Sequence, residues 1–361
     1  MPAPITLDDL RRYAVARSLF TPTTLPRAIA KLGFVQADPI RAPARAQDLI
    51  LRQRVKDYRA GDLERRYPRL AIEEDYFVNY GFVSRELHAL MHPRTARNVW
   101  TAAKKRRAQS LLDFIRERGQ VHPREVEEFF AHGKVTNAWG GSSSATTHLL
   151  DGMHYRGWLR VARRDNGIRL YELREQTASD PDPVAHLDAL VDVAVAKYAP
   201  LPALGLSTLA SHLRLGVPQW SGERKAALAR ARARLAHTRI DGVDWFWPAD
   251  ERPQSARHAP DDRVRLLAPF DPVVWDRRRF ELFWGWAYRF EAYTPAPKRK
   301  LGYYALPLLW RERVIGWGNL AVNDGRLACE LGYVAGRPPA ERAFRSALEQ
   351  ELAAMRGFLG L

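Results

Sequence analysis

The chain has 361 residues, enough for about two to four domains, and carries 57 lysines and arginines against 41 acidic residues, a net charge of +16. This charge favours a polyanionic partner; a basic chain that merely stays soluble is the alternative. The single cysteine, Cys329, excludes an intramolecular disulfide and a cysteine-based zinc site and predicts an intracellular, cytoplasmic protein. Met1-Pro2-Ala3-Pro4 does not resemble a secretory signal, and no run of eighteen apolar residues predicts a membrane span.

The first sixty residues predict helices over 8–18 and 25–32, a short strand over 34–38 and a helix over 44–56. Gln36-Ala37-Asp38 lies on the predicted strand, where residues two apart point to the same face. An amide and a carboxylate would then be able to act on one substrate atom. The alternative is an ordinary turn, because Asp-Pro often ends a strand.

The segment after this tripeptide is rich in basic residues. Arg41, Arg45, Arg52, Arg54 and Lys56 occupy the faces of the predicted 44–56 helix that its apolar residues leave open. Guanidinium groups suit bidentate phosphate contacts, so Arg41, Arg45 and Arg52 are candidates for binding a phosphate backbone. A basic face that is merely solvated is the alternative.

Residues 104–176 predict a compact module. Helices over 108–118 and from Pro123, with Val126, Phe129 and Phe130 pointing inward, precede a third helix that runs to His154 after the polar stretch 140–144. Two strands, 158–162 and 168–173, then flank Asn166-Gly167, a strong hairpin signal. Three helices and a hairpin form a winged helix, whose third helix enters a groove of DNA while its wing touches the backbone.

A second module of the same shape follows over 184–250. Helices near 186–198, 207–213 and 221–237 lead into a strand pair around Asp241-Gly242, and the short polar linker 177–183 separates the two modules. Winged helices also mediate protein contacts. For either module, the alternative is therefore that it binds a protein and touches no nucleic acid.

From about residue 262 the sequence becomes rich in strand-forming residues. Five strands are expected at 264–267, 286–292, 303–310, 313–321 and 327–334, with a helix over 275–283 and a final helix over 339–358. We therefore predict an α+β protein with tandem winged-helix domains followed by a small C-terminal β-barrel, for which a curled sheet is the alternative. Its domains would be 1–103 (winged-helix-like, with the Gln-Ala-Asp motif), 104–176, 184–250 and 262–361.

Four C-terminal stretches resemble the signature of the YcaQ/AlkZ family of bacterial DNA glycosylases. They are Leu267-Ala268-Pro269-Phe270-Asp271-Pro272, Trp275-Asp276-Arg277-Arg278-Arg279, Tyr293-Thr294-Pro295-Ala296-Pro297-Lys298-Arg299 and Gly302-Tyr303-Tyr304-Ala305-Leu306-Pro307-Leu308-Leu309-Trp310. Together with Gln36-Ala37-Asp38 the resemblance covers essentially the whole chain. It implies tandem winged helices and a β-barrel around a basic channel.

The resemblance also implies an activity: hydrolysis of the N-glycosidic bond of N7-alkylated purines and unhooking of DNA interstrand crosslinks. The family's catalytic motif has Gln, an apolar residue, then Gln or Asp, so Gln36 and Asp38 match its Gln-x-Asp branch, which favours broad alkyl and mustard-type lesions. One segment departs from the family: where a His-Glu-Ala-Ser-like run is expected, residues 75–82 read Asp-Tyr-Phe-Val-Asn-Tyr-Gly-Phe, and Asn79 and Tyr80 cannot supply the same titratable groups.

The chemistry suits these two residues. N7-alkylation makes the purine a cationic leaving group, so no general acid is needed, and Asp38 would stabilise positive charge on the sugar and guide water to C1′. Gln36 would orient water or the nucleotide. Because a crosslinked base cannot swing fully out of the duplex, an open channel with cations along the backbone is expected.

We expect the duplex contacts at residues spread over three segments: Arg41, Arg45 and Arg52; Ser144, Thr147, Arg163 and Arg164; and Lys298, Arg299 and Lys300. For each, an ordinary surface residue is the alternative. His88, His92, His148 and His154 do not form a metal-binding motif, so no metal and no cofactor is predicted.

Two other functions stay open. A winged-helix transcriptional regulator would bind particular sequences and release no base. A bifunctional lyase would form a Schiff base through a lysine, but no lysine adjoins the motif in the sequence. We predict a monofunctional, monomeric enzyme that acts on double-stranded DNA in the bacterial cytoplasm, associated with the nucleoid.

Overall fold

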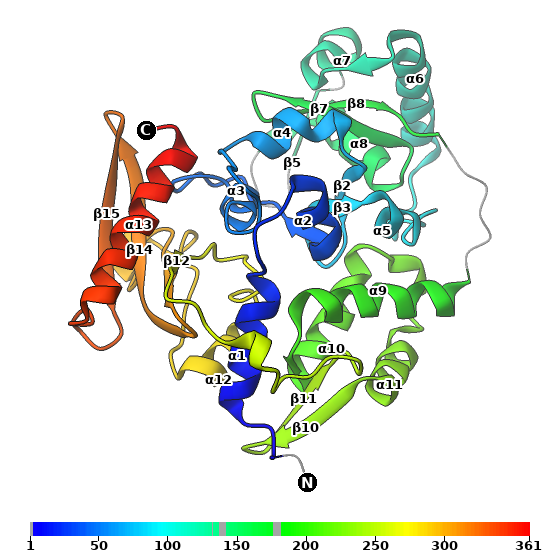
Figure 1. Ribbon diagram of the computed structural model, residues 1–361. Helices are drawn as coiled ribbons and strands as arrows, with labels where there is room; N and C mark the ends of the chain where they lie inside the picture. Colours follow the sequence, from blue (N-terminus) through cyan, green and yellow to red (C-terminus); the bar gives the residue numbers. More distant parts are fainter. Residues whose placement is uncertain (1–2, 132, 137–141, 176–181) are drawn as a thin grey trace. The chain divides into compact units, whose positions relative to one another are not determined.

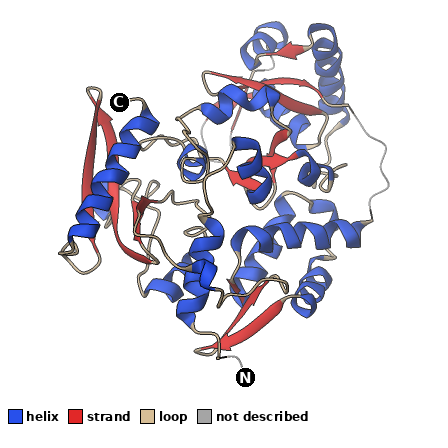
Figure 2. Cartoon of the chain, viewed as in Figure 1, coloured by secondary structure: helices blue, strands red, loops and turns tan. Residues whose placement is uncertain are grey.

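The computed structural model describes residues 3–131, 133–136, 142–175 and 182–361 (Figure 1). Helices and strands are mixed along the chain, so the fold is α+β, as predicted (Figure 2). The chain divides into two compact units: the first contains Met1–Leu63, Val191–Ala210 and Ala226–Leu361, and the second contains Glu64–Leu190 and Ser211–Lys225. The division into four modules stays a prediction. Among the described helices, none is long and apolar enough to cross a bilayer.

The first unit begins with helices α1 (Leu7–Ser18) and α2 (Leu25–Leu32). Gly33 ends α2 in a backbone conformation with φ of 65°, and an added Cβ would lie 2.8 Å from Cγ1 of Val193, so glycine is required there. Strand β1 (Phe34–Gln36) follows and is buried throughout. The strand is shorter than predicted because the side chain of Asp38 accepts the N–H of Ile40 and bends the chain.

Helix α3 spans only Ala46–Leu51, not the predicted 44–56. The chain leaves the helix because its backbone pairs with an earlier segment instead: the N–H of Thr23 donates to the carbonyl of Arg54, and the N–H of Lys56 donates to that of Thr23. Arg54, predicted on an open face, is fully buried and bonded to both carboxylate oxygens of Asp271, at 2.8 and 3.0 Å.

The middle of the chain forms three helices and a hairpin, as predicted. They are α9 (Pro183–Tyr198), α10 (Ala203–His212), α11 (Arg224–Arg234), β10 (Ala236–Ile240) and β11 (Val243–Trp247), with the short strand β9 (Leu201–Pro202). The antiparallel sheet has the order β10-β11-β9. Asp241 and Gly242 both have positive φ, which suits a tight hairpin turn.

The C-terminal sheet is an open, curled antiparallel meander in the order β12-β13-β14-β15, which matches the predicted curled sheet and not a closed barrel. The strands are β12 (Val264–Leu266), β13 (Leu306–Trp310), β14 (Arg313–Asn323) and β15 (Arg326–Tyr333). The expected strand over 286–292 is absent, because the N–H of Tyr288 bonds to the carbonyl of Trp286 and folds the backbone sharply. Helix α13 (Arg342–Leu359) contacts β12, and α12 (Arg277–Trp284) follows the Asp271 segment (Figure 1).

One hydrophobic cluster joins the two ends of the first unit. Val15 of α1 and Leu19, just after this helix, pack with Val274 and Phe280 and with Leu309 of the C-terminal sheet. The start of the first unit is therefore anchored to its C-terminal region.

The second unit contains short elements, then a helical module with a hairpin. Its elements are α4 (Asp62–Arg66), β2 (Ile72–Tyr76), β3 (Tyr80–Ser84), α5 (Arg85–Ala89), α6 (Ala102–Arg118), β4 (Gln120–Val121), α7 (Pro123–Phe130), β5 (Lys134–Thr136), β6 (Ser142–Ser144), α8 (Ala145–Tyr155), β7 (Leu159–Asp165) and β8 (Ile168–Leu173). Strands β4, β8 and β7 form one antiparallel sheet (Figure 2).

Details of this module both match and differ from prediction. Asn166 and Gly167 have positive φ at the hairpin turn, as expected, and Val126 is buried. Phe129 was expected inside but is 65% exposed, because the face of α7 that packs inward is the one that carries Val126. The Phe129 ring lies 4.8 Å from that of Phe114. Helix α6 begins at Ala102, where the Thr101 side chain caps it. The predicted polar stretch at 140–141 and most of the linker at 177–181 lie outside the described residues.

Candidate active site

Gln36 is the last residue of β1 and is 3% exposed. Its side-chain oxygen accepts the indole N–H of Trp275 at 3.0 Å, across 239 positions of sequence. The segment between β12 and α12 therefore holds the Gln36 side chain, and the amide oxygen is engaged in this internal hydrogen bond. The NH2 group is the part of this side chain that can donate a hydrogen bond to a ligand.

Asp38 lies in the loop after β1 and is 9% exposed. Its backbone N–H donates to Oε1 of Gln47 at 3.4 Å, and its Oδ1 accepts the N–H of Ile40 at 2.9 Å. Burial raises the pKa of the carboxyl, and the Ile40 hydrogen bond only partly offsets this. Within the described part of the chain, no cation acts on this pKa, so the carboxylate is held without an ionic partner.

An aromatic group from the C-terminal region lies near this carboxylate. The ring of Phe290 is 5.3 Å from that of Tyr304 and 6.0 Å from that of Tyr293. Burial raises the pKa of both tyrosines, and the charge of Asp38 raises each further, which places Asp38 within electrostatic reach of both hydroxyls. Tyr293 is 74% exposed, whereas Tyr304 is 2% exposed. The charge of Asp38 thus acts on one solvated and one buried tyrosine.

A groove of about 760 Å³ begins beside this group. The loop after Asp38 forms one wall with Arg41, and Tyr303 and Tyr304 lie opposite with residues of β14 and β15. Arg41 is exposed, as its predicted role requires. A groove of this size holds a nucleotide fragment.

The other predicted basic residues of the first unit differ in their surroundings. Lys298 and Lys300 are exposed; Arg299 donates from Nε to the carbonyl of Thr294 and lies 5.0 Å from the ring of Tyr303. Arg45 is half-buried. Arg52 is not retained as a phosphate contact, because its side chain is 5% exposed and its guanidinium is paired with Glu351 at 2.8 Å.

The predicted contacts of the second unit lie on α8 and the β7–β8 hairpin. Ser144 accepts the N–H of Thr147 and caps α8, and it also donates to Glu127. Arg163 is exposed on β7. Arg164 is not retained as a phosphate contact, since its Nε and NH2 groups bond to Glu74 at 2.8 and 2.6 Å. The structure itself does not test the roles of the remaining candidates.

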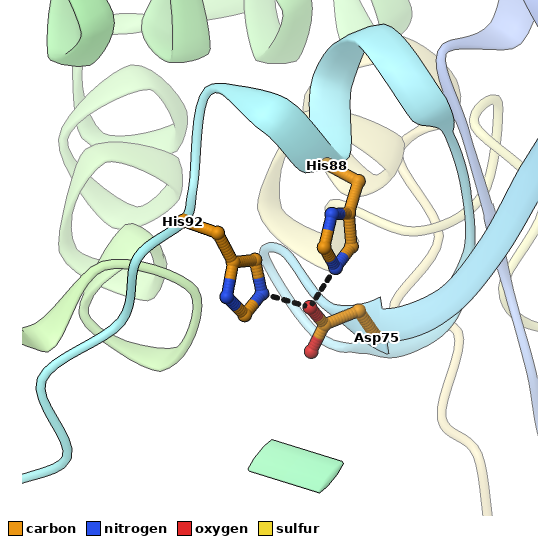
Figure 3. A group of neighbouring side chains, drawn as sticks. All are labelled: Asp75, His88 and His92. Atoms are coloured by element: carbon orange, nitrogen blue, oxygen red, sulfur yellow. Dashed lines mark hydrogen bonds and ion pairs between the residues drawn. The ribbon is translucent and has the colours of Figure 1, made fainter. Parts of the chain in front are cut away.

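Asp75, His88 and His92 bring three potential metal ligands together (Figure 3), their ligating atoms within 4.8 Å of one another. Oδ2 of Asp75 is 3.1 Å from Nε2 of His88 and 2.8 Å from Nε2 of His92. The guanidinium of Arg94 already neutralises the same carboxylate, at 2.7 and 3.1 Å.

The surroundings of His88 do not suit a metal ion. NH1 of Arg174 lies 3.4 Å from Nδ1 of His88, and because arginine can only donate, Nδ1 must accept. The proton therefore sits on Nε2, whereas a histidine that binds metal through Nε2 carries its proton on Nδ1. The group is a buried ion-pair network around Asp75, the first residue of segment 75–82.

Two features of the site could not be predicted from the sequence. In the sequence, Tyr304 and Trp275 are only letters of the signature, and the hydrogen bond from Trp275 to Gln36 spans 239 positions. Lys197 also adjoins the motif in space: its Nζ donates to the carbonyl of Phe34, and burial, with Arg54 nearby, lowers its pKa to about 7. Lys197 is 4% exposed, so its amine holds β1 through a buried hydrogen bond.

Comparison with known proteins gives two matches. A family model described as DNA glycosylase AlkZ-like matches residues 29–358. The solved structure of Streptomyces sahachiroi DNA glycosylase AlkZ is similar over 99% of this chain and 98% of that chain, with a TM-score of 0.63 and 14% sequence identity. At that identity the structural likeness supports a shared fold, whereas the family model covers nearly the whole chain.

Proposed function

The chain belongs to the AlkZ-like family of DNA glycosylases, and we propose that it hydrolyses the N-glycosidic bond of N7-alkylated purines and unhooks DNA interstrand crosslinks, with Asp38 and Gln36 as its catalytic residues. The observation that carries this proposal is the state of Asp38. Its carboxylate is buried and has no cationic partner among the described residues, and the loop that follows it forms one wall of a groove.

A carboxylate of this kind suits a reaction in which positive charge grows on a sugar. As the C1′–N9 bond breaks, its electron pair moves to the base and cancels the charge left by N7-alkylation. Water bonds to C1′ and gives a proton to Asp38. Because burial reduces screening, an unpaired carboxylate stabilises the cationic sugar more than a solvated one would.

Gln36 positions the reacting nucleotide in this scheme. Its oxygen is occupied by Trp275, so its NH2 group is oriented as a donor. A glutamine cannot serve as a strong base, which leaves proton transfer to Asp38.

We further propose that duplex binding uses the tandem winged-helix arrangement. In the second unit, α6, α7, α8 and the β7–β8 hairpin form one such module, with contacts from Ser144, Thr147 and Arg163. In the middle of the chain, α9, α10, α11 and β10–β11 form another. In the first unit, Arg41, Arg45, Lys298, Arg299 and Lys300 hold the backbone near Asp38.

The experiment is a release assay on three duplexes: one unmodified, one with N7-methylguanine, and one with a nitrogen-mustard crosslink between guanines. Mass spectrometry detects free base, and a denaturing gel detects unhooked strands. We expect release from both damaged duplexes and none from the unmodified one. Tight binding of a particular undamaged sequence, with no release from either lesion, would instead support a transcriptional regulator.

We propose a monofunctional enzyme. A lyase needs an amine that reaches C1′, and Lys197, the lysine beside β1, has its amine bonded to Phe34. Borohydride added during the reaction should therefore trap no covalent complex with DNA. A trapped complex that is lost in Lys197→Met would show lyase chemistry and contradict this part of the proposal.

A further inference from the structure

The hydroxyl of Tyr304 is buried and, within the described residues, has no hydrogen-bond partner. The residue is only 2% exposed. A buried polar group without a partner is costly, and in native proteins it commonly marks an ordered water or a ligand. The position of this hydroxyl therefore requires an explanation.

The groups that face Tyr304 restrict what this partner can be. Its ionisation is influenced by burial, then by the charges of Asp38, Tyr288, Tyr293 and Arg277. Tyr288 already donates its hydroxyl to the carbonyl of Ala305 at 2.7 Å, and Arg277 donates to the carbonyl of Val274 at 2.5 Å. Asp38 is the carboxylate whose charge acts on this hydroxyl, and the loop after Asp38 lines the same groove as Tyr304, with no direct hydrogen bond between the two side chains.

We propose that Asp38 and Tyr304 together hold the hydrolytic water, with Tyr304 as a positioning residue. The inference rests on the proposed function and extends it. A water that bridges these groups has two polar partners, the minimum for an ordered buried water. Asp38 accepts one hydrogen and the phenol oxygen accepts the other, so the water's lone pairs point away from both groups and toward C1′.

The reaction step then balances. The water oxygen bonds to C1′ while the C1′–N9 pair leaves with the base, and the hydrogen held by Asp38 passes to that carboxylate and later to solvent. Tyr304 keeps its own proton throughout and only fixes the direction of attack.

The test is Tyr304→Phe, with Tyr333→Phe as the matched control, since Tyr333 is the last residue of β15 and is not among the residues that line the groove. Under single-turnover conditions on N7-methylguanine duplex, Tyr304→Phe should lower the rate about 10- to 100-fold, as expected for one lost hydrogen bond to a reacting group. Duplex affinity should not change, and the control should match wild type.

The pH profile separates positioning from a structural role. Without the bridging water, the Asp38 carboxylate loses a hydrogen bond, so the acid limb of the rate profile should move to higher pH in Tyr304→Phe. An unchanged rate, or a rate lowered by the same factor at every pH, would overturn the inference. If Asp38→Asn is inactive while Tyr304→Phe is normal, the proposed function stands and only this inference fails; an inactive wild type overturns both.

A crystal structure of the wild-type protein gives a readout that does not depend on any variant. We expect one ordered water within about 3.2 Å of both a carboxylate oxygen of Asp38 and the hydroxyl oxygen of Tyr304. A dry gap, or a direct Tyr304–Asp38 hydrogen bond, would contradict the proposal.

Discussion

Asp38 combines burial with negative charge, and this combination has a cost in stability. Burial raises its pKa, so the folded protein holds the protonated form more readily than the unfolded chain does. Ionising the group therefore destabilises the fold, and this cost appears as pH rises through the raised pKa. An active site that needs an unpaired carboxylate therefore lowers the free energy of unfolding in return for catalytic activity.

Asp38→Asn should therefore melt at a higher temperature than wild type near pH 7.5, and the difference should shrink as the pH falls and Asp38 becomes protonated. Differential scanning calorimetry across pH measures this. Asp261→Asn is the control of opposite sign: burial raises the pKa of Asp261, but Arg265 and Arg263 outweigh this and hold it at about 2, so its replacement should lower the melting temperature at neutral pH. A lower melting temperature for Asp38→Asn at pH 7.5 would contradict our account of its environment.

Asp75 shows the reverse balance. Burial alone would raise its pKa, but Arg94, His88 and His92 outweigh burial and hold the pKa well below the ordinary range. Its contribution to stability is present above the ordinary aspartate pKa and is lost as pH falls through the folded value.

Asp75→Asn should destabilise the protein by about 3–5 kcal/mol at neutral pH, because Arg94 then stays buried without its counter-ion. The exposed pair Arg116–Asp113 gives the control, and Arg116→Ala should cost less than about 1 kcal/mol. Denaturant titration of both variants measures the difference. If the wild-type protein binds zinc and Asp75→Asn loses that binding, our assignment of this group as an ion-pair network is wrong.

Several residues of the site could be found from the sequence, and others could not. Gln36 and Asp38 follow from a short pattern beside an arginine-rich segment. The pairing of Arg52 with Glu351 and of Arg54 with Asp271 could not be predicted, because these partners lie hundreds of positions apart and only the fold brings them together. The same holds for Trp275 against Gln36.

At the scale of elements, the β7–β8 hairpin separates a structural arginine from a candidate DNA contact. Adjacent residues on β7 have side chains on opposite faces of the sheet, so Arg163 is exposed while Arg164 is bonded to Glu74. The two substitutions should therefore have different effects.

Arg163→Ala should weaken binding to all duplex sequences and reduce the slope of log affinity against log salt by about 0.9, the value for one phosphate contact. Arg164→Ala should lower the free energy of unfolding, because Glu74 loses its buried partner, and it should leave the salt slope of the folded protein unchanged. Fluorescence anisotropy over a range of salt concentrations measures both. Equal slopes for Arg163→Ala and wild type would remove Arg163 from the proposed interface.

The local signals predicted most elements well. Helical spacing located α2 and α7, and Asn-Gly and Asp-Gly located both hairpin turns, because these features depend on neighbouring residues. The strand expected over 286–292 failed because its alternating aromatic residues resemble a strand while the Trp286–Tyr288 hydrogen bond folds the backbone.

At the scale of the whole molecule, the charge of +16 and the family membership agree on a DNA substrate. Positive charge alone attracts any polyanion and does not specify a reaction. The family assignment supports glycosylase activity, and we propose the buried, unpaired Asp38 as the side chain that carries it.

The most direct test of this account is the single-turnover rate of base release from N7-methylguanine duplex by wild type and by Asp38→Asn, with enzyme in excess and duplex affinity measured in parallel. We predict that the substitution lowers the rate by about 10²–10³ or more, as for the loss of a preorganised electrostatic group, with affinity nearly unchanged. Release by Asp38→Asn at the wild-type rate would contradict the account.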